Sequence, residues 1–237
     1  RSIEDTWTPI GITSTNPFRG NFNGNNHTIS DLNVSSNVAY SGLFGYIYVS
    51  CGTGGIKDLV VEGNVRGTSY VGGIVGFGRG LNSSTYFTIE NCHFKGSVIA
   101  SSSYSGGVCG CLGAYSTAKE STATGDVTST SSYVGGIVGK SSGDGNSSLS
   151  SFCTFARDSV LNCANNAKVT GSSYVGGICG YNYMSEVRYC LNAGEVITTS
   201  GTATSIGGIV GYNDGYRAYV AQCLNVYGFN SKEGNII

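Results

Sequence analysis

The sequence predicts an all-β protein whose parallel strands wind into a β-solenoid of about six to seven coils. Three observations predict this fold. A glycine-rich phrase recurs about every 30 residues, a pair of core positions keeps a constant six-residue offset, and no segment keeps the 3.6-residue apolar period of an amphipathic helix. Repeats of this length build elongated proteins in which each unit packs on its neighbours. Because crossovers between parallel strands are nearly always right-handed, we expect a right-handed solenoid.

The glycine-rich phrase sets the register of the coils. Its six copies end at Gly45, Gly76, Gly110, Gly139, Gly180 and Gly211, at intervals of 31, 34, 29, 41 and 31 residues. Since each strand must lie about 4.8 Å from its predecessor, equivalent side chains should form columns. One column is aliphatic and contains Ile74, Val108, Ile137, Ile178 and Ile209. Another is expected at a corner, with packed rings and solvated hydroxyls, and contains Tyr40, Tyr70, Tyr104, Tyr133 and Tyr174.

A second phrase follows each copy of the first. It pairs an apolar, Ser or Cys position with an apolar position six residues later, as in Leu59–Val65, Cys92–Val98, Ser121–Val127, Cys163–Val169 and Cys190–Val196. Two residues after the Cys column stand Asn165, Asn192 and Asn225. Their amides could hydrogen-bond to one another up the stack, or they could be ordinary turn residues in solvent.

We expect a single domain over residues 1–237. Residues 1–38 form a lead-in coil, residues 39–229 hold the six repeats, and residues 230–237 form a tail. The chain opens on Arg1, without a methionine or a signal-like apolar stretch, so we expect it to be a piece of a larger protein.

Composition argues against two classes of partner. The net charge is −1 and charged residues make up 11% of the chain, so no basic field is present to hold nucleic acid. No run of 18 apolar residues occurs, so we expect no membrane insertion by this segment.

Residues that could support catalysis are scattered. Cys92 and His93 are adjacent, so in a strand they face opposite sides and cannot act as a nucleophile and base pair. Asp58, Glu90 and Glu120 come nearest to a carboxylate cluster, but they occupy slightly different columns. We therefore expect no catalytic site, no metal site and no cofactor.

The nine cysteines divide into two groups. Six stand at repeat positions that other copies fill with apolar residues, and we expect these to be buried free thiols: Cys92, Cys109, Cys163, Cys179, Cys190 and Cys223. Cys51, Cys111 and Cys153 lie in or beside inserts and are the better candidates for a disulfide.

The phrases resemble the GLUG repeat. The lead-in strengthens the likeness with Trp7, Pro9, Ile10 and Gly11, followed by Pro17, Phe18, Gly20, Phe22, Gly24, Asn25, Thr28, Ile29 and Leu32. GLUG repeats occur in large bacterial surface proteins, adhesin-like proteins, the non-catalytic solenoid of some immunoglobulin-A-cleaving proteases and some protist proteins. The resemblance covers about residues 7–225 and implies a scaffold without a catalytic motif. The long insert after Gly139 and the serine at position 205 depart from the pattern.

Partner binding is expected at the two longest inserts, residues 77–88 and 140–159. Variable lengths in a solenoid map to loops on one edge, and such loops commonly bind partners. The candidate contacts are arginine and aromatic residues, which are favoured at binding hot spots: Arg79, Tyr86, Phe87, Phe152, Phe155 and Arg157. The alternative is that these aromatic side chains fold down and cover the flank of the solenoid.

These observations favour a non-catalytic module of an extracellular or cell-surface protein, adhesin-like or a spacer, with a glycan or protein ligand. One alternative is a structural subunit that self-associates into a filament or coat through its ends or edges, because solenoid ends expose unpaired strands. A lesser alternative is a polysaccharide-acting enzyme, which would need carboxylates gathered on one face.

Replacing Ile137 with aspartate tests the register. The substitution puts an unpaired charge into the aliphatic column, so Ile137→Asp should unfold the protein, as measured by circular dichroism and denaturant titration. Arg66→Asp, one residue after Val65, is the control and should stay folded. A folded and stable Ile137→Asp protein would contradict the register.

Overall fold

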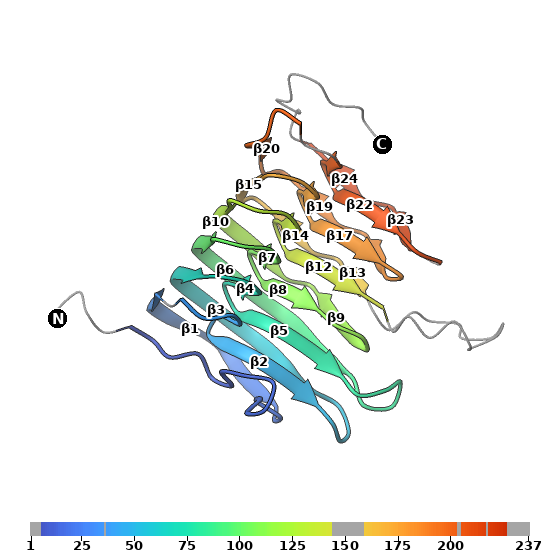
Figure 1. The fold of residues 1–237 in the computed structure, drawn as a ribbon. Coiled ribbons are helices and arrows are strands. Elements are labelled where there is room, and N and C mark those ends of the chain that lie inside the picture. The colour runs from blue at the N-terminus through green and yellow to red at the C-terminus, as the bar shows by residue number, and fades with distance from the viewer. Residues whose placement is uncertain (1–5, 36, 144–158, 203–204, 217, 227–237) are drawn as a thin grey trace.

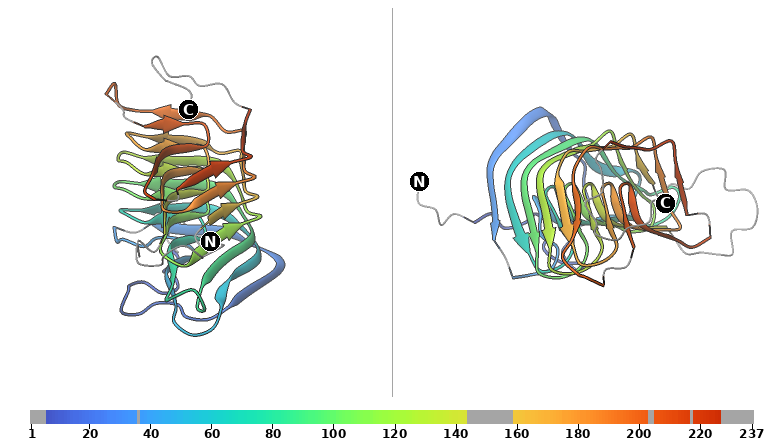
Figure 2. Two further views of the ribbon diagram at one scale, coloured as in Figure 1. Left: turned by 90° about the vertical axis from the view of Figure 1, so that its right-hand side faces the viewer. Right: turned by 90° about the horizontal axis from the view of Figure 1, so that it is seen from above.

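The computed structural model describes residues 6–35, 37–143, 159–202, 205–216 and 218–226. These residues form an all-β solenoid of about six turns, built from three parallel sheets of 13, six and five strands (Figure 1). Successive coils stack along one axis, from the N-terminal lead-in to the last described coil (Figure 2). The predicted fold class is confirmed. Within the described residues there is no helix long and apolar enough to cross a membrane.

The six-stranded sheet holds the strand that ends each glycine-rich phrase. All neighbours pair in parallel and in register, for example Phe44 with Val75 and Val138 with Cys179. In spatial order the strands are β2 (Phe44–Val49), β5 (Val75–Gly80), β8 (Cys109–Leu112), β12 (Val138–Ser142), β17 (Cys179–Tyr183) and β22 (Val210–Asp214).

The five-stranded sheet consists of two-residue strands. Each strand ends on the first of the paired glycines of its phrase, and the strands are β4 (Val71–Gly72), β7 (Ser105–Gly106), β11 (Val134–Gly135), β16 (Val175–Gly176) and β21 (Ile206–Gly207).

The 13-stranded sheet holds the second phrase of each coil. In the first coils this phrase is one long strand, and in later coils it is broken into shorter pieces. The strands are β1 (Phe22–Ser35), β3 (Gly54–Gly67), β6 (Phe87–Ala100), β9 (Ser116–Lys119), β10 (Thr122–Ser129), β13 (Ser159–Leu161), β14 (Ala164–Asn165), β15 (Lys168–Gly171), β18 (Glu186–Arg188), β19 (Leu191–Asn192), β20 (Val196–Thr198), β23 (Tyr219–Ala221) and β24 (Leu224–Asn225).

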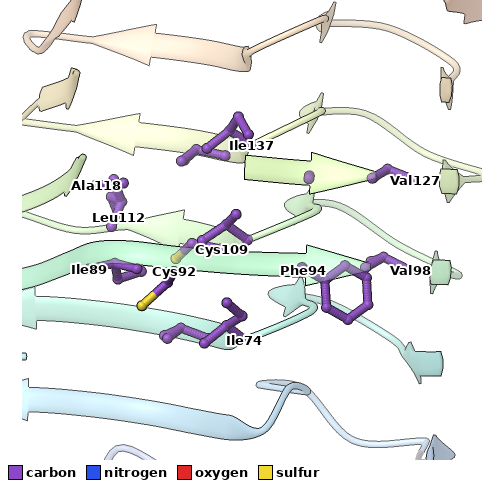
Figure 3. Packing of buried hydrophobic residues seen from close by; sticks show 14 of the residues in the cluster. Ile74, Ile89, Cys92, Phe94, Val98, Cys109, Leu112, Ala118, Val127 and Ile137 are labelled. Atoms are coloured by element: carbon purple, nitrogen blue, oxygen red, sulfur yellow. The ribbon is translucent and has the colours of Figure 1, made fainter. Parts of the chain in front are cut away.

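The predicted core columns are confirmed. Val65, Val98, Val127, Val169 and Val196 pair in register across successive strands of the 13-stranded sheet. Backbone hydrogen bonds join the aliphatic column, such as Val108 N–H to the Ile137 carbonyl at 3.0 Å. Ile74, Ile137 and Val127 are buried, and Figure 3 shows them inside the coil with Phe94 and Cys92.

The asparagine column forms a buried hydrogen-bonded ladder. Asn165 Nδ2 donates to Asn192 Oδ1 at 2.9 Å, and Asn192 Nδ2 donates to Asn225 Oδ1 at 2.8 Å. Asn165 and Asn192 are fully buried. The glycine of the phrase that faces each amide makes the room: a Cβ at Gly136 would overlap the Asn165 side chain. Of the two alternatives for these asparagines, the structure confirms the hydrogen-bonded ladder in the interior rather than a turn in solvent.

The chain turns its corners through residues in the left-handed region. The tyrosine column lies at one corner, where Tyr40, Tyr70, Tyr104, Tyr133 and Tyr174 have φ between 52° and 68°, followed by Ser205 at 66°. A second corner stacks Asp58, Asn91, Glu120, Asn162, Tyr189 and Gln222, with φ between 49° and 56°. A residue with a Cβ loses roughly 1–2 kcal/mol in this conformation, so surrounding interactions must hold it there.

The two ends of the solenoid differ. At the N-terminal end the lead-in packs across the first coil: Ile10 bridges to Phe44, Phe18 bridges to Ile47, and Trp7 Nε1 donates to the Leu43 carbonyl at 3.1 Å. The last described coil leaves core positions exposed. Val220 pairs in register with Val187, yet it is 36% exposed whereas Val187 is 0% exposed.

Glu120 provides a test of the corner geometry. Its side chain is exposed and its φ is 53°, so substitutions there change mainly the backbone preference. Glu120→Val should lower the free energy of unfolding by at least about 1 kcal/mol relative to Glu120→Asn, because asparagine tolerates the left-handed region and valine does not. Denaturant titration measures the difference. The control Thr128→Val, within strand β10, should be tolerated, and equal stability of the two Glu120 variants would contradict the corner geometry.

Candidate binding surface

Half of the predicted insert 77–88 is strand. Residues 77–80 belong to β5 and residues 87–88 to β6, so a six-residue turn remains, closed by a bridge between Asn82 and Thr85. Phe87 is 0% exposed and its ring lies beneath Gly78, where a Cβ would overlap it. The prediction that Phe87 contacts a partner is therefore wrong, because this ring fills the core.

The second insert falls largely outside the described residues. Residues 140–142 belong to β12 and residue 159 begins β13. The candidate contacts Phe152, Phe155 and Arg157 lie within 144–158, a range that the structure does not describe.

Tyr86 lines a pocket of about 230 Å³ at the edge of the first coils. Lys57 and Glu90 contribute charge to the pocket, and Glu90 also forms an ion pair with Lys119 at 2.8 Å. The remaining lining comes from Asn21, Phe22, Asn23, Thr53, Gly54, Gly55, Ile56 and Thr88.

The most extensive aromatic feature runs along the tyrosine corner. The five rings stack with successive centroid distances of 4.9, 4.7, 5.0 and 4.9 Å, and their planes lie within 23° of parallel. Each side chain is partly exposed. In the described part of the chain, none of the five hydroxyls has a protein hydrogen-bond partner. Since the ring faces pack on one another, the hydroxyls are the polar groups that this corner presents.

A second aromatic column lies beside this corner on the outer face of the six-stranded sheet. It consists of the residue that follows each phrase: Tyr46, Phe77, Cys111, Lys140, Tyr181 and Tyr212. Tyr46 stacks on Phe77 at 4.7 Å and Tyr181 on Tyr212 at 5.6 Å. Their edges meet the corner rings, as where Tyr40 and Tyr46 lie at 86°. We call the tyrosine corner, this column and the neighbouring Tyr48 the aromatic flank.

Three cations in or beside the aromatic flank lie over aromatic rings. The Arg19 and Arg79 guanidinium carbons are 5.2 and 5.5 Å from the centroid of Tyr48. Lys140 Nζ lies 5.3 Å from the Tyr181 centroid and 5.8 Å from that of Tyr104. Among the described residues, none of these three cations has an ion-pair partner.

The 13-stranded sheet shows the opposite arrangement. Five of its cations form ion pairs: Lys57–Asp58, Lys95–Glu62, Lys119–Glu90, Lys168–Glu195 and Arg188–Glu186. Among the described cations, the four without an ion pair are Arg66 on this sheet and Arg19, Arg79 and Lys140 at the aromatic flank.

Burial raises the pKa of several tyrosines of the flank. It raises the pKa of Tyr70 to about 12 and raises the pKa values of Tyr46 and Tyr104 above the usual range. The pKa of Tyr181 is raised first by burial and then by the hydrogen bond to Asp214, at 2.9 Å. These hydroxyls can donate hydrogen bonds throughout the neutral pH range.

The three carboxylates singled out in the sequence do not converge. Asp58 accepts a hydrogen bond from Asn91 at 2.8 Å, and Asn91 separates it from Glu120 in the corner column. Glu90 is paired with Lys119 in a different column. His93 lies on the opposite side of β6 from buried Cys92, where burial lowers its pKa and its ring nitrogens contact Thr122 and Asn91. Within the described ranges, no group of three His, Cys, Asp or Glu side chains is arranged to hold a metal.

The described cysteines are all free. Cys92, Cys163 and Cys190 are buried in one column, as predicted, and Cys223 continues it, half-buried. Cys51 is exposed whereas Cys111 is buried on the flank, where burial raises its pKa to about 12. A disulfide between these two is therefore contradicted, and Cys153 lies outside the described residues.

Comparison with known proteins supports the fold. No family model matches the chain, and no curated protein matches it. The crystal structure of a Bacteroides ovatus protein, provisionally described as an immunoglobulin A1 protease, resembles it with a TM-score of 0.68 and 20% identity. The match covers 94% of this chain and 64% of the other. At this identity the likeness shows a shared β-solenoid fold alone.

Proposed function

We propose that this chain is a non-catalytic, GLUG-like repeat module of an extracellular or cell-surface protein, adhesin-like in action, which binds a glycan through its aromatic flank. The proposal rests on one observation: five stacked tyrosines at the corner present hydroxyls that no described protein group occupies. Saccharides are dense in hydroxyls, and each phenol can donate to one and accept from another.

The regular spacing of the corner favours an extended polymeric ligand. Ring centroids follow one another at 4.7 to 5.0 Å along the stack, so the flank repeats the same chemistry in five coils. A polymer with a repeating unit can use several of these positions at once, which raises the total affinity without a strong individual contact.

A protein strand is a poorer fit to this flank. Peptides commonly bind to sheets by adding a strand at an open edge. The internal strands of the six-stranded sheet, such as β8 and β12, already have a neighbour on both sides. The flank offers side chains rather than unpaired backbone, which favours a ligand recognised through hydroxyls and ring edges.

Tyrosine-to-phenylalanine substitution tests the flank without removing the stack. Tyr104→Phe should weaken binding to glycans that are captured on a glycan array by roughly three- to tenfold for each lost hydrogen bond, and the triple variant at positions 70, 104 and 133 should weaken it further. Tyr189→Phe, at the other corner, is the matched control. Unchanged binding by the triple variant would show that the flank does not bind the glycan. Cleavage of the captured glycan would contradict a non-catalytic role.

A second candidate function is self-association through the C-terminal end of the solenoid. The last described coil exposes Val220, Leu224 and Val226 by 36%, 59% and 58%. Sedimentation velocity over a wide concentration range distinguishes the candidates. Concentration-dependent polymers that Val220→Asp abolishes would favour self-association, and a monomer at every concentration would exclude it.

A further inference from the structure

Arg19 and Arg79 share one aromatic ring at the N-terminal end of the flank. Tyr48 and Arg79 are register partners on β2 and β5, and Arg19 reaches the same ring from the lead-in. Both guanidinium carbons lie within 5.5 Å of the ring centroid, so they are no more than about 11 Å apart. Two like charges repel at this separation, and the ring face offsets part of that repulsion.

Both guanidinium groups keep donors for a ligand. Arg19 uses Nη1 for the Ser50 hydroxyl at 3.0 Å, and Arg79 uses Nε for the Gly80 carbonyl at 3.2 Å. Each guanidinium has five N–H donors, so most remain available, and these contacts fix where the forks lie. A pre-positioned guanidinium fork matches a carboxylate, which accepts two parallel hydrogen bonds.

The surroundings of this pair differ from those of the ion-paired cations of the 13-stranded sheet. Lys95 and Lys119, on the 13-stranded sheet, lie 3.0 and 2.8 Å from a carboxylate. In the described structure no carboxylate forms an ion pair with Arg19, Arg79 or Lys140.

We propose that the Arg19–Tyr48–Arg79 group is a carboxylate site, and that the glycan bound by the flank is an acidic polysaccharide containing uronic acid units. This inference rests on the proposed function and narrows its ligand class. Arg19 and Arg79, which flank Tyr48 in the stack, each bind a sugar carboxylate, while the tyrosine hydroxyls further along the corner bind the hydroxyls of the same polymer. Lys140 supplies a third positive charge further along the flank.

A matched pair of ligands tests the inference. Galacturonate oligosaccharides and their carboxyl-reduced counterparts differ only in carrying –COO⁻ or –CH₂OH. In titration calorimetry at low ionic strength, the acidic form should bind at least tenfold more tightly, and the difference should shrink at high salt because exposed charges are screened. Arg79→Gln and Arg19→Gln should each weaken binding of the acidic form severalfold and leave that of the reduced form unchanged. Lys95→Gln, which removes an ion-paired cation from the 13-stranded sheet, is the control and should change neither.

The outcomes separate the two proposals. Equal affinity for both forms would overturn the carboxylate site and leave a neutral-glycan flank standing. If neither form binds, and no glycan on an array does, the proposed function falls and the inference falls with it. Equal binding of polyglutamate would overturn the saccharide assignment and identify an acidic peptide as the ligand. If an arginine variant does not fold, the salt dependence of binding by the unmodified protein still tests the carboxylate site.

Discussion

In-register parallel pairing constrains almost every residue of this chain, because each side chain lies directly on its counterpart one coil away. A position must therefore hold a residue that tolerates a copy of itself, or one that complements its neighbour. Valine meets this condition by packing, and asparagine meets it because one amide can donate upward while it accepts from below. Charged residues cannot repeat, so Lys57, Glu90 and Lys119 alternate in one column.

The same constraint explains the tyrosine corner. A left-handed backbone is costly for a residue with a Cβ, yet the corner places tyrosine there in five successive coils. Each ring packs on the next at about 5 Å, and the neighbouring column adds edge-to-face contacts. Such aromatic pairs contribute about 0.5–1.5 kcal/mol each, which is similar to the backbone cost. The stacked rings thus offset the backbone cost at the five tyrosine positions of this corner.

The sequence was sufficient to predict the columns because their residue types repeat. It was not sufficient to predict the aromatic flank, for two reasons. Counting from the last glycine of each phrase treated residues 77–80 as an insert, whereas they continue strand β5 and carry Arg79 outward. The second aromatic column holds different residue types, such as Tyr46, Cys111 and Lys140, so the sequence did not show that these positions are equivalent. The one indication was that four of its six residues are aromatic. Nothing in the sequence indicated the left-handed backbone conformation of the tyrosines, since tyrosine is not typical of that region.

The geometry of the stack also determines what kind of ligand the flank can bind with little loss of conformational entropy. Strand pairing fixes the corner hydroxyls in a line along the solenoid axis, so little side-chain freedom is lost when a ligand binds. A line of weak, evenly spaced donors gains most from a long ligand that lies parallel to the axis. With Arg19 and Arg79 at one end, such a ligand gains a defined direction and starting point as well.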